Sequence, residues 1–461
     1  MKTIQTAILP TEHQFVKLQK EHQMHLEAIC VFIATGFFMD DDTYWKDQKC
    51  LSPGHIYHID DNGFFVDKKP WFHWSYEPED GSFEDTLEAY IQLMTSTIKS
   101  QIGDNDVILP LSGGLDSRSQ ALFLKDLDNE VHSYSYSFQG GYPEHKISKQ
   151  IAEVCGFGFQ SFTIQKGYLW DQISELSNIN QCYSEFTHPR QMAVLKALKQ
   201  YEGVFSLGHW GDVFFDRGAP EGMQQHDIVP LLFKKMVKKS GLELANQLWN
   251  TWALDGDFKS YLISRIETAL SKIQIDNVSA KVRAFKTTQW AHRWTTTNLS
   301  IFKAAHPITL PFYDDQVCQF VCRTPETHLA DRKLQLAHLK QHKALASITW
   351  HENRPFNILN YHKNRSPYNL PFRVKSKLKR SVNAWLGNPF IQRNWELQFL
   401  GKDNEAELKR FILSDGFNDL VPIAIVETAL EKFKTEDAVA YSHALSMLLT
   451  LSVWNQNKNA F

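Results

Sequence analysis

A short segment rich in glycine and serine has the residue types that hold phosphate groups. It starts at the end of the apolar run 107–111, and it consists of Leu111, Ser112, Gly113, Gly114, Leu115, Asp116 and Ser117. Adjacent glycines allow a tight turn and a close approach of the backbone to a ligand. Serine hydroxyls and the free N–H groups of a following helix can donate hydrogen bonds to phosphate oxygens. We therefore predict a phosphate-binding loop over residues 111–117, with an ordinary glycine turn that opens a helix as the alternative.

Asp116 is the unusual residue of this segment, because a bare carboxylate repels phosphate unless a cation lies between the two. Carboxylate oxygens are ligands that Mg²⁺ accepts, commonly together with substrate phosphates. Asp116 therefore predicts a magnesium ion at the loop. The chain contains no GxxxxGK[ST] sequence, so a P-loop that supports cleavage at the γ-phosphate has no basis in it.

The segments around this loop alternate between strand and helix patterns. The pattern predicts strands at 107–111, 131–138, 159–164 and 203–207, and helices at 117–127, 145–155 and 191–200. Such alternation is typical of an α/β fold with a parallel, doubly wound sheet and helices on both faces. Ligands of these sheets bind beyond the carboxyl ends of the strands, which is where residues 111–117 lie.

Changes of pattern divide the chain into three predicted domains. Residues 1–75 read as a small α+β unit with a helical stretch over 12–33 and a hairpin turn in the sequence DDNG. Residues 76–370 contain the α/β alternation and then a mainly helical part. Residues 371–461 form a helical extension.

Composition and charge disfavour several classes of partner. The formal net charge of -3 and the pI near 6.7 give no bulk attraction for a nucleic acid. The chain has no signal-peptide pattern and no apolar run long enough to cross a bilayer, which predicts a cytoplasmic protein without a membrane partner. The basic residues at 373–380 are interpreted as a solvated helix face. The six cysteines lack the spacing of a zinc site, so we expect no structural metal.

Three segments resemble known motifs. The string SGGLDS at 112–117 resembles the signature of the ATP pyrophosphatases, or PP-loop proteins, which implies a HUP-like sheet and cleavage of ATP to AMP and pyrophosphate. The segment 206–215 resembles the SGEGSDELF motif of asparagine synthases, and the segment 306–315 resembles a later element of the same family. The matching positions are Ser206, Gly208, Asp212, Phe215, Pro311, Phe312 and Asp314.

The resemblance implies a site for ATP and Mg²⁺. Asp116 and Asp212 are the implied magnesium ligands, and Gly208 joins the residues of the 111–117 loop in holding the nucleotide. Phe138, at the end of the strand after the first helix, is implied to frame the adenine together with Ser137.

The amino-terminal part departs from the family pattern. Asparagine synthases carry a glutamine-hydrolysing cysteine after the initiator, whereas Lys2 stands there in this chain and the first cysteine is Cys30. Residues 34–66 still resemble the closing part of the family's Ntn-type glutaminase domain. We therefore expect a shortened remnant of that domain, without glutaminase activity. Ammonia or an amine would supply the nitrogen, and a separate glutaminase is a possible partner.

Two further departures concern catalytic groups. His209 replaces the glutamate of the family motif, and it either removes a proton from the incoming amine or only packs and bonds within the site. The family lysine that neutralises phosphate charge has no clear match, so Arg354 and Lys363 are the candidates, each with a surface cation as the alternative.

These observations predict an asparagine synthase-like ligase that adenylates a carboxylate and forms an amide. Aspartate, a peptide carboxyl group or a sugar acid are the candidate acids, and asparagine biosynthesis is the implied process. A PP-loop enzyme that modifies nucleobases is a rival, but the chain lacks its paired cysteines and basic RNA-binding domain. A catalytically impaired member that only binds nucleotide, as a partner subunit, is the second rival.

Overall fold

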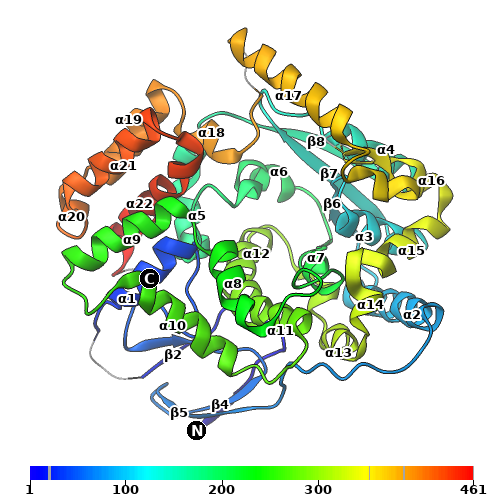
Figure 1. Cartoon of the computed structure of the whole chain (residues 1–461), viewed down its shortest axis with the longest axis horizontal. Helices are drawn as coiled ribbons and strands as arrows, with labels where there is room; N and C mark the ends of the chain where they lie inside the picture. Colours follow the sequence, from blue (N-terminus) through cyan, green and yellow to red (C-terminus); the bar gives the residue numbers. More distant parts are fainter. Residues whose placement is uncertain (19–21, 352–353, 388–389, 460–461) are drawn as a thin grey trace.

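A five-stranded parallel sheet lies at the centre of the α/β part of the chain (Figure 1). This computed structural model describes residues 1–18, 22–351, 354–387 and 390–459. The strand order is β10-β9-β6-β7-β8, and all neighbouring pairs are parallel. The strands are β6 (Val107–Pro110), β7 (Val131–Phe138), β8 (Gly158–Ile164), β9 (Val204–Ser206) and β10 (Ile308–Thr309).

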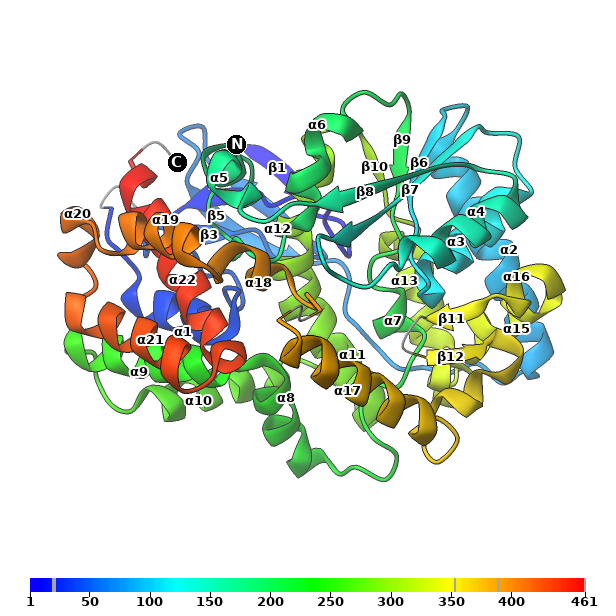
Figure 2. The same ribbon diagram turned by 90° about the horizontal axis from the view of Figure 1, so that it is seen from above.

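Helices cover both faces of this sheet, as predicted (Figure 2). One face carries α2 (Phe83–Ile102), α3 (Leu115–Lys125) and α4 (His145–Cys155). The chain then returns across the other face through α5 (Tyr168–Asn180), the short helix η1 (Arg190–Val194) and α6 (Leu195–Leu198). The apolar positions of α2 recur at helical spacing, and its first turn is fixed by a capping box between Ser82 and Asp85.

The chain reverses its direction across the sheet at β6. From β6 it moves to β7 and β8 on one side, and it later returns to place β9 and β10 on the other side. The carboxyl ends of β6 and β9 therefore lie next to each other, and the loops that leave them diverge. Such a switch point is where doubly wound sheets bind their ligands.

A run of helices follows the sheet strands. It comprises α7 (Gly211–Phe214), α8 (Ile228–Met236), α9 (Lys239–Thr251), α10 (Phe258–Ser271), α11 (Val278–Phe285), the π-helix η3 (Lys286–Thr295) and α12 (Thr296–Lys303). The three segments α11, η3 and α12 are continuous, so η3 is a wide stretch inside one long helix. Wide helical turns of this kind are frequent at functional sites.

The amino-terminal part contains a small antiparallel sheet and one buried helix. The sheet order is β1-β4-β5, with β1 (Lys2–Gln5), β4 (His55–Ile59) and β5 (Phe65–Pro70). The β4–β5 pair confirms the hairpin prediction. The predicted helix over 12–33 is wrong in its first half, because β2 (Phe15–Lys17) pairs with β3 (Gln48–Cys50) and α1 (Leu26–Thr35) starts later. The likeness to a glutaminase remnant stays a prediction.

The buried helix α1 belongs to a hydrophobic cluster that also includes carboxyl-terminal residues. It packs against α9, and α9 packs against α22 (Ala438–Asn457). The imidazole of His443 contacts the main-chain oxygen of Ile33 at 2.9 Å, and the rings of Tyr44 and Trp454 stack with centroids 4.2 Å apart. A second cluster surrounds the parallel sheet. The predicted domain boundaries near 75 and 370 stay predictions.

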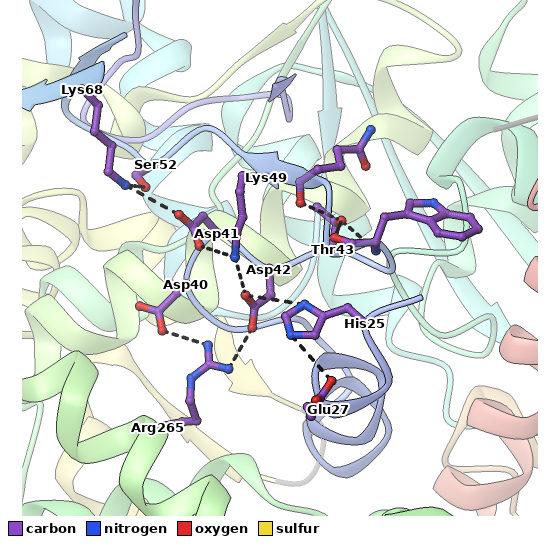
Figure 3. A network of polar contacts seen from close by, with 12 residues as sticks. His25, Glu27, Asp40, Asp41, Asp42, Thr43, Lys49, Ser52, Lys68 and Arg265 are labelled. Carbon is purple, nitrogen blue, oxygen red and sulfur yellow. Dashed lines mark hydrogen bonds and ion pairs between the residues drawn. The ribbon is translucent and has the colours of Figure 1, made fainter. Parts of the chain in front are cut away.

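A network of polar contacts joins the segment 40–42 to the helical run (Figure 3). Arg265 of α10 contacts the carboxylates of Asp40 at 3.1 Å and Asp42 at 2.8 Å. Arg293 of η3 donates to the main-chain oxygens of the same two aspartates, each at 2.7 Å. Burial acts to raise the pKa of Asp42, but Arg265, Lys49 and His25 together outweigh it and the pKa is lowered. The segment therefore fixes the position of η3.

The rest of the chain is mainly helical. The remaining elements are η2 (Gln225–Asp227), η4 (Pro311–Tyr313), α13 (Asp315–Arg323), α14 (Glu326–Leu329), η5 (Ala330–Arg332), α15 (Lys333–Gln341), α16 (Lys343–Ser347), β11 (Thr349–His351), β12 (Arg354–Asn357), η6 (Ile358–Asn364), α17 (Leu370–Trp385), α18 (Asn394–Phe399), α19 (Lys402–Ile412), α20 (Asp415–Asn418) and α21 (Ile423–Thr435). Within the described ranges, no helix combines the length and the apolar character that a bilayer crossing requires.

Candidate active site

A cavity of about 600 Å³ opens at the switch point, at the carboxyl ends of β6 and β9. The loop after β6 contributes Ser112, Asp116 and Ser117 to its lining, and the loop after β9 contributes residues 208–210, 212 and 213. The helical segment 286–302 closes the opposite side. The structure thus brings the two sequence motifs together around one space.

The loop after β6 is held in shape by its own serines. The hydroxyls of Ser112 and Ser117 lie 2.9 Å apart, and the backbone N–H of Ser112 donates to the Ser117 oxygen at 3.1 Å. The N–H of Gly114 donates to the Ser112 oxygen at 3.2 Å. A Cβ on Gly113 would lie 2.6 Å from the main-chain oxygen of Trp350, so no larger residue fits there. Gly114 and Leu115 then open α3, whose first N–H groups are the donors that a phosphate needs.

Arg118 fixes this loop from behind. Its buried guanidinium donates to the main-chain oxygens of Ile348 at 3.1 Å, Thr349 at 2.8 Å and Gly113 at 3.4 Å. Burial lowers the pKa of Arg118 to about 10, which leaves it charged at neutral pH. The arginine stands directly after the SGGLDS string, but its partners Ile348 and Thr349 lie more than 200 residues further along, so sequence reasoning missed it.

Asp116 lies at the first turn of α3 and lines the cavity. Its Oδ1 accepts hydrogen bonds from the guanidinium of Arg332 and from the side-chain amide of Gln335, the latter at 2.9 Å. Burial raises the pKa of Asp116 to about 6, Arg332 works against this rise, and the nearby carboxylate of Asp212 adds to it. Two carboxylates that repel each other at a cavity wall are an arrangement that a divalent cation relieves.

The loop after β9 approaches Asp116 closely because of its glycines. A Cβ on Gly211 would lie 2.5 Å from the Asp116 Oδ1, and a Cβ on Gly208 would lie 3.2 Å from the Asp116 carbonyl carbon. Trp210 takes a left-handed conformation with φ of 77° and starts α7. Its indole N–H donates to the hydroxyl of Thr287 at 3.1 Å, which links this loop to η3.

The family model of asparagine synthase matches residues 90–388, which include both loops and η3. This chain belongs to the asparagine synthase family. It is accordingly an ATP-dependent ligase of the PP-loop superfamily. The family resemblance inferred from the motifs and the α/β fold predicted with it are confirmed.

The comparison with curated proteins gives no match, and the comparison with solved structures gives matches of low similarity. Among solved structures, an NMN synthetase from Francisella tularensis has a TM-score of 0.23 and 14% identity, over 46% of this chain and 94% of that chain. A glutamine-dependent NAD⁺ synthetase from Acinetobacter baumannii, solved with ADP, has a TM-score of 0.21 and 11% identity, over 50% of this chain and 44% of that chain.

The cations at the cavity of this asparagine synthase family member are not those that the sequence suggested. Arg354 is exposed and stacks its guanidinium on the ring of Trp350 at 4.4 Å, and neither Arg354 nor Lys363 lines the cavity. Lys286, the first residue of η3, lines it instead. Burial lowers the pKa of Lys286 to about 8, the neighbouring Lys235 lowers it further, and Asp212 opposes the shift. No motif marks Lys286 in the sequence, so only the fold reveals it.

His209 lies between the two sides of the cavity. Burial lowers its pKa to about 4, although the carboxylate of Asp212 acts to raise it, so the imidazole is neutral at pH 7. Its ring meets that of Phe302 edge-on, with centroids 5.7 Å apart, and its Nδ1 is buried without a hydrogen-bond partner in the described parts of the chain. A free, uncharged ring nitrogen can accept a proton from a ligand.

The predicted adenine-framing residue lies at the edge of the site. The guanidinium of Arg190 covers the ring of Phe138 at 5.8 Å, and Arg190 itself lines the cavity. Tyr134, Ser135 and Tyr136, on the same strand, line the cavity directly. The strand predicted for adenine binding therefore reaches the site, chiefly through residues that precede Phe138.

Proposed function

We propose that this ligase uses ATP to activate a carboxylic acid and then transfers the acyl group to ammonia or an amine. The carboxylate oxygen attacks the α-phosphorus, the bond to the β-phosphate oxygen breaks, and pyrophosphate leaves. The nitrogen then attacks the acyl carbon, AMP leaves, and the nitrogen loses a proton. The observation that carries this proposal is the meeting of the Ser112–Ser117 loop, two aspartates and Lys286 around one cavity.

The loop after β6 and the two aspartates have the chemistry for the phosphate end of ATP. The helix N-terminus and the serine hydroxyls bind the pyrophosphate portion. Asp116 and Asp212 offer the hard oxygen ligands that Mg²⁺ requires, and their mutual repulsion supports a cation between them. When bound, Mg²⁺ supplies neutralisation of charge on the phosphates.

Lys286 has the position and charge to stabilise the departing pyrophosphate. It faces the same cavity as the loop and comes from the opposite wall. Its lowered pKa of about 8 keeps it mostly protonated at pH 7, so it can place a positive charge on the phosphates. His209, which is neutral at that pH, has the role of accepting the proton of the attacking amine.

The nitrogen source is part of the proposal. All six cysteines are buried, and burial raises the pKa of Cys30, the first of them, so that its thiol stays protonated. A protonated, buried thiol does not act as the nucleophile of a glutaminase. Free ammonia, an amine or a separate glutaminase subunit would supply the nitrogen, and purification under mild conditions tests for such a second chain.

The experiment follows oxygen from the acid into AMP. The protein is incubated with Mg·ATP, an amine or ammonia, and carboxylic acids labelled with ¹⁸O, including aspartate and sugar acids. Adenylation transfers one labelled oxygen to AMP and releases one pyrophosphate for each amide formed. Asp116→Ala should abolish both, because it removes a magnesium ligand. Release of ADP and phosphate, or AMP without label, would contradict the proposal.

One contact supports a second candidate function, in which this family member binds nucleotide without cleaving it. The guanidinium of Arg332 pairs with the Asp116 carboxylate, which would otherwise be available to a cation. Under this alternative, ATP binds with an affinity that Mg²⁺ does not change, and no acid yields pyrophosphate. Titration of ATP with and without Mg²⁺, in the intact protein and in Arg332→Gln, separates the two candidates.

A further inference from the structure

A second cavity of about 640 Å³ adjoins the first. The two share Arg190, Trp290 and Trp294 in their linings, so these three side chains stand between them. The second cavity lies between the η3 segment, the start of α9 and residues of α22. We refer to it as the basic chamber. Its volume is in the range of pockets that hold small organic ligands, which are about 300–1,000 Å³.

The lining of the basic chamber is strongly cationic. Six side chains carry positive charge: Arg190, Lys234, Lys235, Lys238, Lys239 and Arg393. Glu185 is the one acidic side chain among the described lining residues, and its carboxylate accepts hydrogen bonds from the backbone N–H of Thr187 at 2.7 Å and from the hydroxyls of Thr187 and Ser446. These cations therefore lack carboxylate partners within the chamber, in contrast to the paired charges of the 40–42 network.

Two histidines of the lining are uncharged at pH 7, chiefly because they are buried. Burial lowers the pKa of His188 to about 3, and Arg190 lowers it further. Burial likewise lowers the pKa of His443 to about 4, and Lys238 adds to the shift. The positive charge of the chamber therefore comes from its lysine and arginine side chains, and the two rings provide flat surfaces for contacts.

Asn394 adds an unused hydrogen-bond acceptor to the chamber. Its side-chain nitrogen donates to the Tyr168 hydroxyl at 2.9 Å and to the main-chain oxygen of Thr187 at 2.7 Å. Asn394 is only 5% exposed, and its Oδ1 is buried without a partner in the described parts of the chain. A buried acceptor of this kind is costly unless a ligand or water donates to it. A ligand hydroxyl meets that need.

We propose that the basic chamber binds the phosphate-bearing end of the acid substrate, whose carboxylate reaches the first cavity past Trp290 and Trp294. Lysine and arginine side chains are the usual partners of phosphate. The tryptophan faces suit a sugar or another ring between the two ends, and Asn394 suits a hydroxyl on it. A protonated amine would be repelled by the same cations, so the chamber selects the acid. This inference rests on the proposed function, because it names the substrate class of that site.

The test compares one acid with and without phosphate. Glucuronic acid 1-phosphate and glucuronic acid serve as probes, and their binding to the intact protein is measured by calorimetry without ATP. We expect the phosphorylated acid to bind at least about tenfold more tightly, as a charge-assisted contact implies. Lys238→Glu should remove this preference. Lys402→Glu, an equal change of charge at an exposed position outside both linings, should keep it.

Equal binding of the two acids, or a preference that Lys238→Glu leaves intact, would overturn the inference. Because Lys238 is exposed, its substitution should leave the thermal unfolding midpoint unchanged, and this is measured on the same samples. Pyrophosphate release is recorded separately with both acids. A binding preference without any release would reject the proposed function alone, whereas release with an unphosphorylated acid and no preference would reject the chamber assignment alone.

Discussion

The two walls of the first cavity are built in different ways. The sheet wall, residues 110–117 and 208–213, presents backbone N–H groups, hydroxyls and two carboxylates from short loops after strands. The helical wall, residues 286–302, presents side chains of a long helix, among them Lys286, Trp290 and Trp294. Glycines fix the first wall, and packing against distant segments fixes the second.

Because of this difference, the sheet wall can carry the chemistry that any acid substrate needs, and the helical wall can carry the chemistry that distinguishes one acid from another. Backbone donors held by Gly113, Gly208 and Gly211 can bind the phosphates of ATP whatever acid is activated. Side chains on a helix can change without disturbing the backbone, so the helical wall is where members of one family can differ in substrate. The basic chamber adjoins the helical wall and not the sheet wall, in agreement with this division.

The largest effect should follow a change in the sheet wall. Asp212→Asn removes one of the two carboxylates and should lower pyrophosphate release by about 1,000-fold, the upper range for loss of one preorganised electrostatic group. Asp403→Asn, at an exposed position in the first turn of α19, is the matched control and should leave the rate unchanged. A loss below tenfold in Asp212→Asn would mean that the carboxylate pair is not required.

A change in the helical wall should lower the rate of pyrophosphate release somewhat less. Lys286→Met should lower the rate by about 100-fold, because a cation near the leaving phosphates is lost. In the intact protein the ammonium is present below its pKa of about 8 and lost above it, so the rate should fall as pH rises through 8. Lys235→Met removes a like charge and should move this fall to higher pH. If the intact protein and Lys235→Met had the same pH profile, the fall in rate would not be due to the titration of Lys286.

A change that shifts a carboxylate without removing it should have an intermediate effect. In Gly211→Ala the new methyl group would lie 2.5 Å from the Asp116 Oδ1, so the carboxylate must move. We expect weaker binding of Mg·ATP by about tenfold, from the strain of a misplaced ligand. Gly81→Ala, where no atom lies within 4 Å of the new Cβ, provides the comparison and should bind normally. Calorimetric titration of both variants with Mg·ATP measures the two affinities.

The smallest effects should come from the cations that the sequence suggested. Arg354→Ala and Lys363→Ala change residues that do not line the cavity, so each should alter the rate by no more than about twofold, as surface substitutions usually do. Steady-state rates of the two variants beside Lys286→Met provide the measurement. A loss as large as that of Lys286→Met in either one would place that cation at the phosphates after all.

Local motifs made the sheet wall predictable. The SGGLDS string, the apolar runs before both loops and the strand–helix alternation all act over short distances along the chain, and they indicated the correct fold, family and cavity position. The helical wall depends on contacts between distant residues. Lys286 lies on the same π-helix as Arg293, whose guanidinium donates to the main-chain oxygens of Asp40 and Asp42, and no short pattern in the sequence indicates that contact.

The dependence on contacts between distant residues also explains two other differences between the sequence-based predictions and the structure. A run of residues from 12 to 33 has helical spacing, but residues 15–17 find strand partners at 48–50 and leave the helix only its second half. Arg118 looks like an ordinary residue of an amphipathic helix until the main-chain oxygens at 345–350 surround its guanidinium. Pairing over long distances decides both cases, and single-sequence patterns do not contain it.

The cluster that joins α1 to α22 has a consequence for the order of folding during synthesis. The strands of the parallel sheet end at residue 309, so this part can assemble while the ribosome still adds residues. Helix α1 must wait for α9 and then for residues 438–457 before its apolar surface is covered. The basic chamber is lined in part by residues 439–446 of α22, so it reaches its final form only after these residues have been added.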